Sequence, residues 1–273
     1  MSELNEQVKE LKNSILKIAE SLNGSESENQ ALAFKAFVYT SLDISLRTFI
    51  SRYEQSGVSK DINHACNFKK HLSIDKAFLT FDDVSKEFEN LDVIKIFDSV
   101  LLYAHIVKTN EPYTDVMSAL AEEFLLSRGR GTAKGQFITP IELSQAIAEL
   151  MDNRTPTDEP VLFGDICVGY GALMLARINR QYNKSRKSLK KLRIVVNDVD
   201  RMACNVAALQ VLMNTVQHDL DIASFTMLCS DAIKDWRTEK PFVISYETPQ
   251  CVFDTFDKIR EDRLKASGYY EIF

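Results

Sequence analysis

The second half of this 273-residue chain alternates short apolar stretches with longer amphipathic ones, and this alternation constrains the fold more than any other feature. Because strands that are joined through helices usually pair in parallel, the pattern predicts an α/β fold with a parallel sheet and helices on both faces. The expected strands are Val161–Asp165, Leu192–Asn197, Phe225–Leu228 and Phe242–Tyr246, and the expected helices between them are Ala172–Tyr182 and Arg201–Asn214.

The first half of the chain is expected to be helical. Its first apolar stripe has heptad-like spacing and ends at Asn23-Gly24; the stripe comprises Leu4, Val8, Leu11, Ile15, Ile18 and Leu22. This stripe is typical of a short coiled coil or of one face of a helical bundle. A second amphipathic stretch at Ala31–Tyr53 favours the bundle. Further helices are predicted at about Ser85–Lys108 and Thr114–Ser127.

A basic, glycine-rich segment at Arg128–Gly135 separates the two patterns and is predicted to be a loop. We therefore divide the chain into a helical domain at residues 1–127 and an α/β domain at residues 128–273. After the loop, Thr139 is the expected N-cap of a helix at Ile141–Met151, with Pro140 in its first turn.

Composition excludes several classes of protein. The chain is 45% hydrophobic and 26% charged, so it can form a core, but no apolar run is long enough to cross a bilayer. The N-terminus does not resemble a signal peptide, and five scattered cysteines suit reduced, buried thiols in a cytoplasmic protein. His64, Cys66 and His71 lack convincing zinc spacing, so no metal site is expected.

The net charge of −6 argues against a large, self-sufficient DNA-binding surface. A local basic patch is still compatible with this charge, and Arg128, Arg130 and Lys134 are the candidate DNA contacts. The basic segment Lys184–Arg193 could also contact phosphates, but a solvated connecting loop is the favoured interpretation.

Acidic residues follow three successive predicted strands. Asp165 precedes a turn that contains Gly169 and Gly171, Asp198 follows the second strand, and Asp231 follows the third. In doubly wound folds, nucleotide-like ligands bind beyond the carboxyl ends of the strands, where an acid can accept hydrogen bonds from ribose hydroxyls. One such acid alone is more often a helix N-cap or a loop residue. Three at successive strand ends favour a nucleoside site.

The order of motifs resembles the modification subunits of type I restriction–modification systems and related adenine-N6 DNA methyltransferases. Gly135–Pro140 resembles the family segment Gly-Gln-Phe-(Tyr/Phe)-Thr-Pro, Asp165–Leu173 its glycine-bearing turn, and Ser230–Ile233 its Gly-Asp-Thr-Leu. The resemblance spans about residues 113–250 and implies a Rossmann-like domain that binds S-adenosylmethionine (SAM). The implied cofactor residues are Gln136, Phe137, Thr139, Pro140, Asp165, Gly169, Gly171, Asp198 and Asp231.

The chain departs from the family where the catalytic Asn-Pro-Pro-Phe is expected. Its residues there are Glu247-Thr248-Pro249-Gln250, so Glu247, Pro249 and Gln250 occupy degenerate catalytic positions. Glu247 lacks the amide donor, and Gln250 offers no stacking face for a flipped base. Tyr170 is bulky enough to narrow the cofactor pocket. The sheet is expected to be incomplete and to end at its fourth strand with an unpaired edge, which a helix in Cys251–Phe273 would cover unless it docks on a partner.

Three hypotheses follow from the resemblance. The chain is an adenine-N6 DNA methyltransferase, a catalytically silent regulator, decoy or antirestriction factor, or a remnant whose cofactor site is plugged by Tyr170. The expected partners are DNA, bound weakly by the chain alone, and a specificity subunit, a modification subunit or a second copy of the chain.

Overall fold

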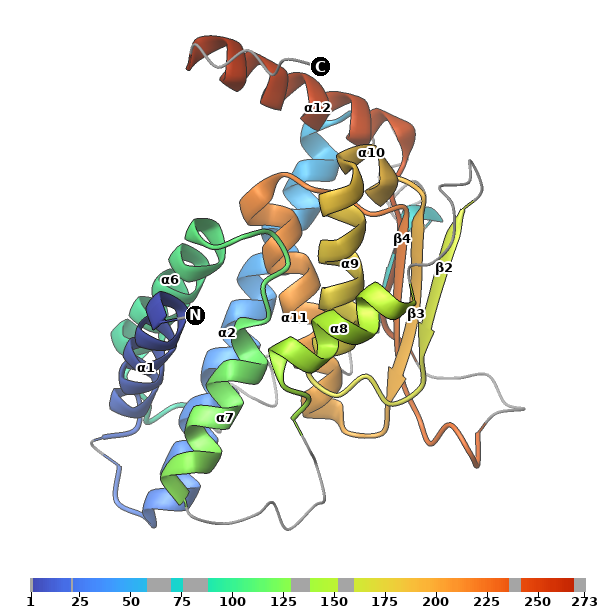
Figure 1. Cartoon of the computed structure of the whole chain (residues 1–273). Coiled ribbons are helices and arrows are strands. Elements are labelled where there is room, and N and C mark those ends of the chain that lie inside the picture. Colours follow the sequence, from blue (N-terminus) through green and yellow to red (C-terminus); the bar gives the residue numbers. More distant parts are fainter. Residues whose placement is uncertain are drawn as a thin grey trace.

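The computed structural model describes residues 2–20, 22–57, 70–75, 88–128, 138–151, 160–235 and 242–267. The helices of the first half are α1 (Ser2–Lys17), α2 (Glu26–Gln55), α6 (Val93–Thr109) and α7 (Val116–Arg128). α1 packs against α2, α6 and α7 (Figure 1), and its heptad residues Val8, Leu11 and Ile15 are buried. The first half is therefore a helical bundle, as the second amphipathic stretch favoured.

Side-chain caps set where two of these helices begin. The Ser25 hydroxyl accepts a hydrogen bond from the Glu28 N–H and starts α2. The Asp92 carboxylate accepts from the Ile94 and Lys95 N–H groups, so α6 begins at Val93, later than the position near 85 that the apolar pattern predicted. The cap decides this boundary because it satisfies amide groups that have no partner inside the helix.

The sheet has five strands in the order β1-β5-β4-β3-β2. Their bounds are β1 (Leu72–Ile74), β2 (Val161–Asp165), β3 (Leu192–Asp198), β4 (Ser224–Cys229) and β5 (Phe242–Glu247). β2, β3 and β4 are parallel, but β5 is antiparallel to β4, with Phe225 opposite Tyr246. The prediction of an all-parallel sheet is therefore wrong at β5. No helix is described between β4 and β5. When two neighbouring strands are joined without a crossover helix, the second strand usually runs antiparallel to the first.

The prediction that the fourth strand, β5, forms an unpaired edge of the sheet is also wrong. β1, from the first half of the chain, pairs antiparallel with β5, and Leu72 lies opposite Tyr246. A three-residue strand in polar surroundings carries too little periodicity to be recognised in the sequence.

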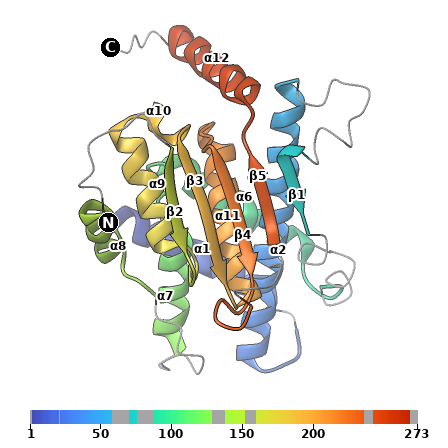
Figure 2. The same ribbon diagram turned by 90° about the vertical axis from the view of Figure 1, so that its right-hand side faces the viewer.

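Helices cover one face of the sheet instead of both. α8 (Ile141–Leu150), α9 (Ala172–Lys184), α11 (Arg201–His218) and α2 lie on one side, and the other side faces the viewer in Figure 2 without a covering helix among the described residues. The strands show the corresponding alternation: Phe163 and Ile194 are buried, whereas Leu162 and Val195 are exposed. We call the uncovered side of the sheet the bare face.

The two halves of the chain share one hydrophobic core. α2 packs along α11, and the Phe49 ring on α2 lies 4.7 Å from the Tyr246 ring on β5. α10 (Arg186–Leu189) and α12 (Gln250–Ala266) lie at the end of the sheet where the parallel strands begin (Figure 1). The domain boundary at residues 127 and 128 stays a prediction from composition.

Candidate functional site

The turn after β2 has the backbone geometry that its glycines predicted. Gly169 has a φ of 55° and Gly171 a φ of 103°, which are left-handed conformations that other residues rarely adopt. A Cβ atom at Gly171 would lie 2.9 Å from Met174 Cε, whereas a Cβ at Gly169 would meet no described atom within 4 Å. At Gly171 it is therefore the backbone conformation that favours glycine, because the Met174 side chain could shift to admit a Cβ atom; space remains in front of Gly169.

Asp198 holds this turn in place. One of its carboxylate oxygens accepts a hydrogen bond from the Gly169 N–H at 2.8 Å, and the other accepts from the Asp200 N–H at 2.9 Å. Asp165, at the end of β2, accepts from the Cys167 N–H at 2.9 Å. A carboxylate has about four lone-pair positions, so Asp198 keeps acceptor capacity for two hydroxyl groups. The structure thus brings Asp165, Gly169 and Asp198 together.

Asn197 ties the three strand ends to one another, and the sequence alone did not reveal this role. Its side-chain amide donates to the carbonyl oxygens of Ile166 and Ser230, and its side-chain oxygen accepts from the Ser230 hydroxyl. Asn197 is buried, so each of these bonds replaces one that water would otherwise make. The sequence signal that could have indicated this role is the position of Asn197, a polar residue immediately after the apolar stretch of β3.

Asp231 lies beyond the end of β4, but its carboxylate is used locally. It accepts from the N–H groups of Ile233 and Lys234, both at 3.1 Å, and it also pairs with the Lys234 ammonium. The Lys234 backbone bond is the main cause that lowers the pKa of Asp231. This geometry matches the capping role that the sequence left open for a single acid.

Tyr170 is directed toward the helical bundle. Its ring is stacked on Phe34 of α2, with 6.4 Å between ring centroids and an interplanar angle of 18°, and burial raises its pKa to about 12. Its carbonyl oxygen accepts from the Gln210 amide at 2.8 Å. Gln210 also donates to the buried Asp115 at the start of α7, so it links this helix to the glycine turn.

The segment Gly135–Pro140, to which the family resemblance assigns four cofactor residues, is only partly described. α8 begins at Ile141, and its N-cap is Pro140, without a side-chain cap bond; the expectation that Thr139 caps the helix is therefore wrong. The Pro140 carbonyl accepts from the Ser144 N–H, so the helix starts at Ile141 as predicted and only its cap residue differs. Gln136, Phe137, Arg130 and Lys134, and the side chain of Arg128, lie outside the described residues.

The degenerate motif lies at the other end of the sheet. Because β5 is antiparallel to β4, Glu247 is paired with Ser224, the first residue of β4. Glu247 forms an exposed ion pair with Arg193, Pro249 is the N-cap of α12, and the Gln250 side chain bonds to Asp254. The structure therefore separates Glu247, Pro249 and Gln250 from Asp165, Asp198 and Asp231 by the length of the strands.

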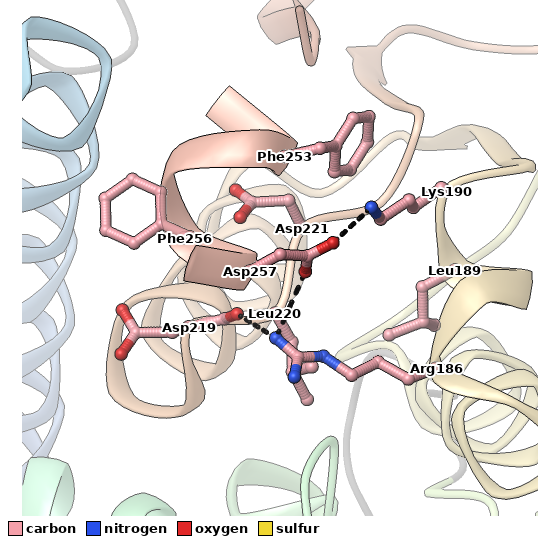
Figure 3. A pocket seen from close by; sticks show the side chains of 9 residues that line it. All are labelled: Arg186, Leu189, Lys190, Asp219, Leu220, Asp221, Phe253, Phe256 and Asp257. Carbon is pink, nitrogen blue, oxygen red and sulfur yellow. Dashed lines mark hydrogen bonds and ion pairs between the residues drawn. The ribbon is translucent and has the colours of Figure 1, made fainter. Parts of the chain in front are cut away.

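A buried ion cluster occupies this opposite end, and the sequence did not indicate it. Arg52 of α2 contacts Asp219 at 2.6 Å and Asp221 at 2.5 Å, and its guanidinium lies 3.7 Å from the centre of the Phe256 ring. Asp257 of α12 pairs with Lys190 and Arg186 (Figure 3). The basic segment Lys184–Arg193, which was predicted to be a solvated loop, thus contains the helix α10. Arg186 of this helix and Lys190, which follows it, form ion pairs with α12. The sequence signal for this cluster was Arg52, a charged residue within the buried apolar stripe of α2.

A cavity within this cluster measures only about 10 Å³, enough for one water molecule and far too small for a nucleoside. Figure 3 shows its lining: Arg186, Leu189, Lys190, Asp219, Leu220, Asp221, Phe253, Phe256 and Asp257. This cavity therefore offers no space for a nucleoside-sized ligand.

Two further observations concern the predictions from composition. Cys167 and Cys251 are exposed, so the expectation of buried thiols holds for Cys204 but fails at these two positions; the four described cysteines are free. In the part of the chain that the structure describes, no helix is long and apolar enough to span a membrane.

The site can now be compared with known proteins. Residues 113–254, about half of the chain, match the sequence pattern of the family described as N-6 DNA Methylase. A comparison with curated protein sequences found no match.

Two solved structures are similar. One is the type I restriction-modification system methyltransferase subunit from Streptococcus thermophilus, with 13% identity, a TM-score of 0.41, and coverage of 88% of this chain and 61% of that one. The other is described as a modification subunit of a type I restriction enzyme from Vibrio vulnificus YJ016. It has 14% identity and a TM-score of 0.43, and the match covers 84% of this chain and 56% of that one. The chain spans about three fifths of the length of these proteins.

Proposed function

The chain belongs to the N-6 DNA Methylase family, and from this premise we propose that it binds SAM at the carboxyl ends of β2, β3 and β4. The observation that carries the proposal is the turn at residues 166–171, which Asp198 holds with space in front of Gly169. Of the residues implied by the resemblance, Asp165, Gly169, Gly171 and Asp198 fit this role best.

The residues present fit the cofactor. The carboxylate of Asp198 has capacity left for the two ribose hydroxyls, and the open side of Gly169 leaves room for the ligand to approach the backbone. When bound, SAM supplies an activated methyl group. The contribution of this chain is to bind and orient that group. Asp231 is the weakest member of the set, because its oxygens already accept local N–H groups.

We further propose that catalysis by the chain alone is impaired. Transfer to adenine requires groups that hold the acceptor amine beside the cofactor. Glu247, Pro249 and Gln250 are tied to Arg193, α12 and Asp254 at the opposite end of the sheet. Among the described residues, the degenerate motif therefore supplies no acceptor site beside the proposed cofactor site.

Calorimetric titration with SAM tests the binding proposal. Wild type should bind, and Asp198→Asn should bind about 10- to 100-fold more weakly, because hydrogen bonds to a charged acceptor contribute about 1.5–3 kcal/mol. Asp43→Asn, a change on the surface of α2, is the matched control and should bind like wild type. Failure of the wild-type chain to bind millimolar SAM would refute the proposal.

A methyl-transfer assay with labelled SAM and adenine-containing DNA tests the second part. We expect no transfer by the chain alone. Restoring Asn-Pro-Pro-Phe at residues 247–250 should not produce transfer, because the new motif would still lie at the opposite end of the sheet. Robust methylation by the wild-type chain contradicts impaired catalysis.

A non-catalytic role as a regulator or decoy in a restriction–modification system is the second candidate function. It is favoured by the separation of the degenerate motif from the cofactor end. With a net charge of −6, DNA binding by this chain would depend on a local basic patch or on a partner subunit. DNA affinity measured at low and moderate salt, with and without an active modification subunit, separates this role from an inert remnant.

A further inference from the structure

Two cysteine thiols, those of Cys204 and Cys229, meet beside the proposed cofactor site. Cys229 is the last residue of β4 and continues the alternation of the buried Phe225 and Met227, so its side chain is directed toward the helix layer. Cys204 lies in the first turn of α11 and is completely buried. Both are free thiols in this structure. The sheet and the helix layer thus each contribute one thiol to the same place.

The backbone at the ends of β3 and β4 brings the two sulfur atoms together. Cys204 Sγ lies 3.5 Å from the carbonyl oxygens of Asp198 and Leu228, and Cys229 Sγ lies 4.0 Å from that of Val199. Asp198 is also the residue opposite Cys229 in the β3–β4 ladder. The two thiols lie within hydrogen-bonding reach of each other, with Cys204 as the donor. They are therefore placed to react with one another.

The two thiols differ in their access to solvent. Cys229 is only partly buried, whereas Cys204 has no exposed surface. Burial raises the pKa of both thiols, but the hydrogen bond from Cys204 acts in the opposite direction on the pKa of Cys229. In reactive dithiols the more accessible thiol reacts first, and its neighbour resolves the adduct. Cys229 therefore has the position of the attacking thiol and Cys204 that of the resolving thiol.

We propose that Cys204 and Cys229 form a reversible disulfide when the protein meets a low-molecular-weight disulfide. The Cys229 thiolate attacks one sulfur of that disulfide, forms a mixed disulfide and releases the other half as a thiolate. Cys204 then loses its proton, attacks Cys229 Sγ and releases the second half as a thiolate. Two protein thiols are oxidised, one small disulfide is reduced, and the two released thiolates take up the two protons.

The disulfide has a consequence for SAM binding, which rests on the proposed function. A disulfide bond is about 2 Å long, shorter than the contact between two free thiols, so its formation draws α11 toward the end of β4. Asp198 contacts both of these elements, and its carboxylate holds the Gly169 N–H. Oxidation should therefore displace this carboxylate and weaken SAM binding.

Peptide mapping of the full chain, without SAM, tests for the disulfide. Trypsin cleaves after lysine and arginine, and both cysteines fall in one tryptic peptide, residues 202–234. The protein is incubated with oxidised glutathione, and its free thiols are then blocked with N-ethylmaleimide. The peptide should escape blocking and be about 2 mass units lighter than its reduced form, because two hydrogens are lost. Dithiothreitol should make both thiols available again.

Substitutions of single cysteines separate the two roles. Cys204→Ala should stop at the mixed disulfide, so that Cys229 keeps one glutathione. Cys229→Ala should yield neither the disulfide nor a glutathione adduct in this peptide, because Cys204 is buried. Cys251→Ala, at an exposed cysteine of α12, is the matched control and should form the disulfide as the wild type does.

Calorimetric titration of the reduced and oxidised proteins tests the consequence for SAM. The oxidised wild type should bind SAM about 10-fold more weakly, the effect of about one lost hydrogen bond to a charged group. Dithiothreitol should restore the affinity. In Cys229→Ala, treatment with oxidised glutathione should leave SAM affinity unchanged.

Two results of peptide mapping would overturn the proposal. One is a wild-type peptide that keeps two free thiols or one stable glutathione, and the other is a cross-link to the peptide that contains Cys167. Equal SAM affinity of the reduced and oxidised forms would refute the link to the cofactor site. If the disulfide forms but neither form binds SAM, the proposed function fails and the disulfide stands.

Discussion

The two ends of the sheet use their polar residues in different ways. At the end where β5 meets α12, Arg52 pairs with Asp219 and Asp221 inside the protein, and the cavity among them holds at most one water. At the carboxyl ends of β2 and β3, Asn197 and Asp198 hold the glycine turn but leave Asp198 with acceptor capacity and Gly169 with open space. The first arrangement leaves no space for a ligand, and the second leaves both space and hydrogen-bond acceptors.

The largest expected effect concerns the ion cluster. Arg52→Met should lower the free energy of unfolding by about 3–5 kcal/mol, because it leaves the buried Asp221 without its partner. Urea denaturation measures the change. Arg47→Met, on the exposed side of the same helix, is the control and should change the free energy of unfolding far less. Equal effects of the two changes would show that the cluster is not a stabilising unit.

At the opposite end, Asn197→Ala should cost about 2 kcal/mol, because Ser230 and the carbonyl of Ile166 lose their buried partner. Hydrogen exchange should accelerate in residues 166–171 before the rest of the sheet, and SAM binding should weaken. Asn183→Ala, an exposed amide on α9, serves as the control. A uniform loss of protection across the protein would argue against local control of the turn.

The stability of the protein should depend on pH through Asp115. Its carboxylate accepts from Gln210, which also donates to the Tyr170 carbonyl in the glycine turn. Burial raises the pKa of Asp115, so the folded state binds its proton more tightly than the unfolded state does. This contribution is fully present below about pH 4, the ordinary range of an aspartate, and is lost as the pH rises through the folded pKa. Wild type should therefore lose stability relative to Asp115→Asn as the pH rises.

The stability difference between Asp115→Asn and wild type should grow as the pH rises from 4 to 7. The asparagine oxygen can still accept from the Ser118 N–H and from Gln210. Thermal melts of both proteins at several pH values measure the effect. A constant difference across this range would contradict a pKa shift at Asp115.

The smallest expected effect is at the degenerate motif. Arg193→Met removes the ion pair with Glu247, whose side chains are 45% and 57% exposed, so the loss should be below about 0.5 kcal/mol. SAM affinity should not change, because the pair lies at the far end of the sheet. A clear loss of SAM affinity in this variant would undermine the separation of the two ends.

Local pattern predicted most elements because local forces set them. β2 was predicted with its observed bounds, since its apolar run ends at an acidic residue before a glycine turn. α9 and α11 began where they were predicted to begin. The helical bundle also followed from apolar spacing, whereas the start of α6 did not, because a capping bond at Asp92 overrode the apolar pattern.

The sequence by itself thus determined the kinds of elements, the glycine turn and the family. Tertiary structure decided how the elements combine. The direction of β5, its pairing with β1 and the covering of one face all depend on contacts between distant segments, which no local periodicity encodes. The same is true of the motifs: their order along the chain placed the Glu247 segment next to the proposed cofactor residues, but one antiparallel strand puts it at the other end of the sheet.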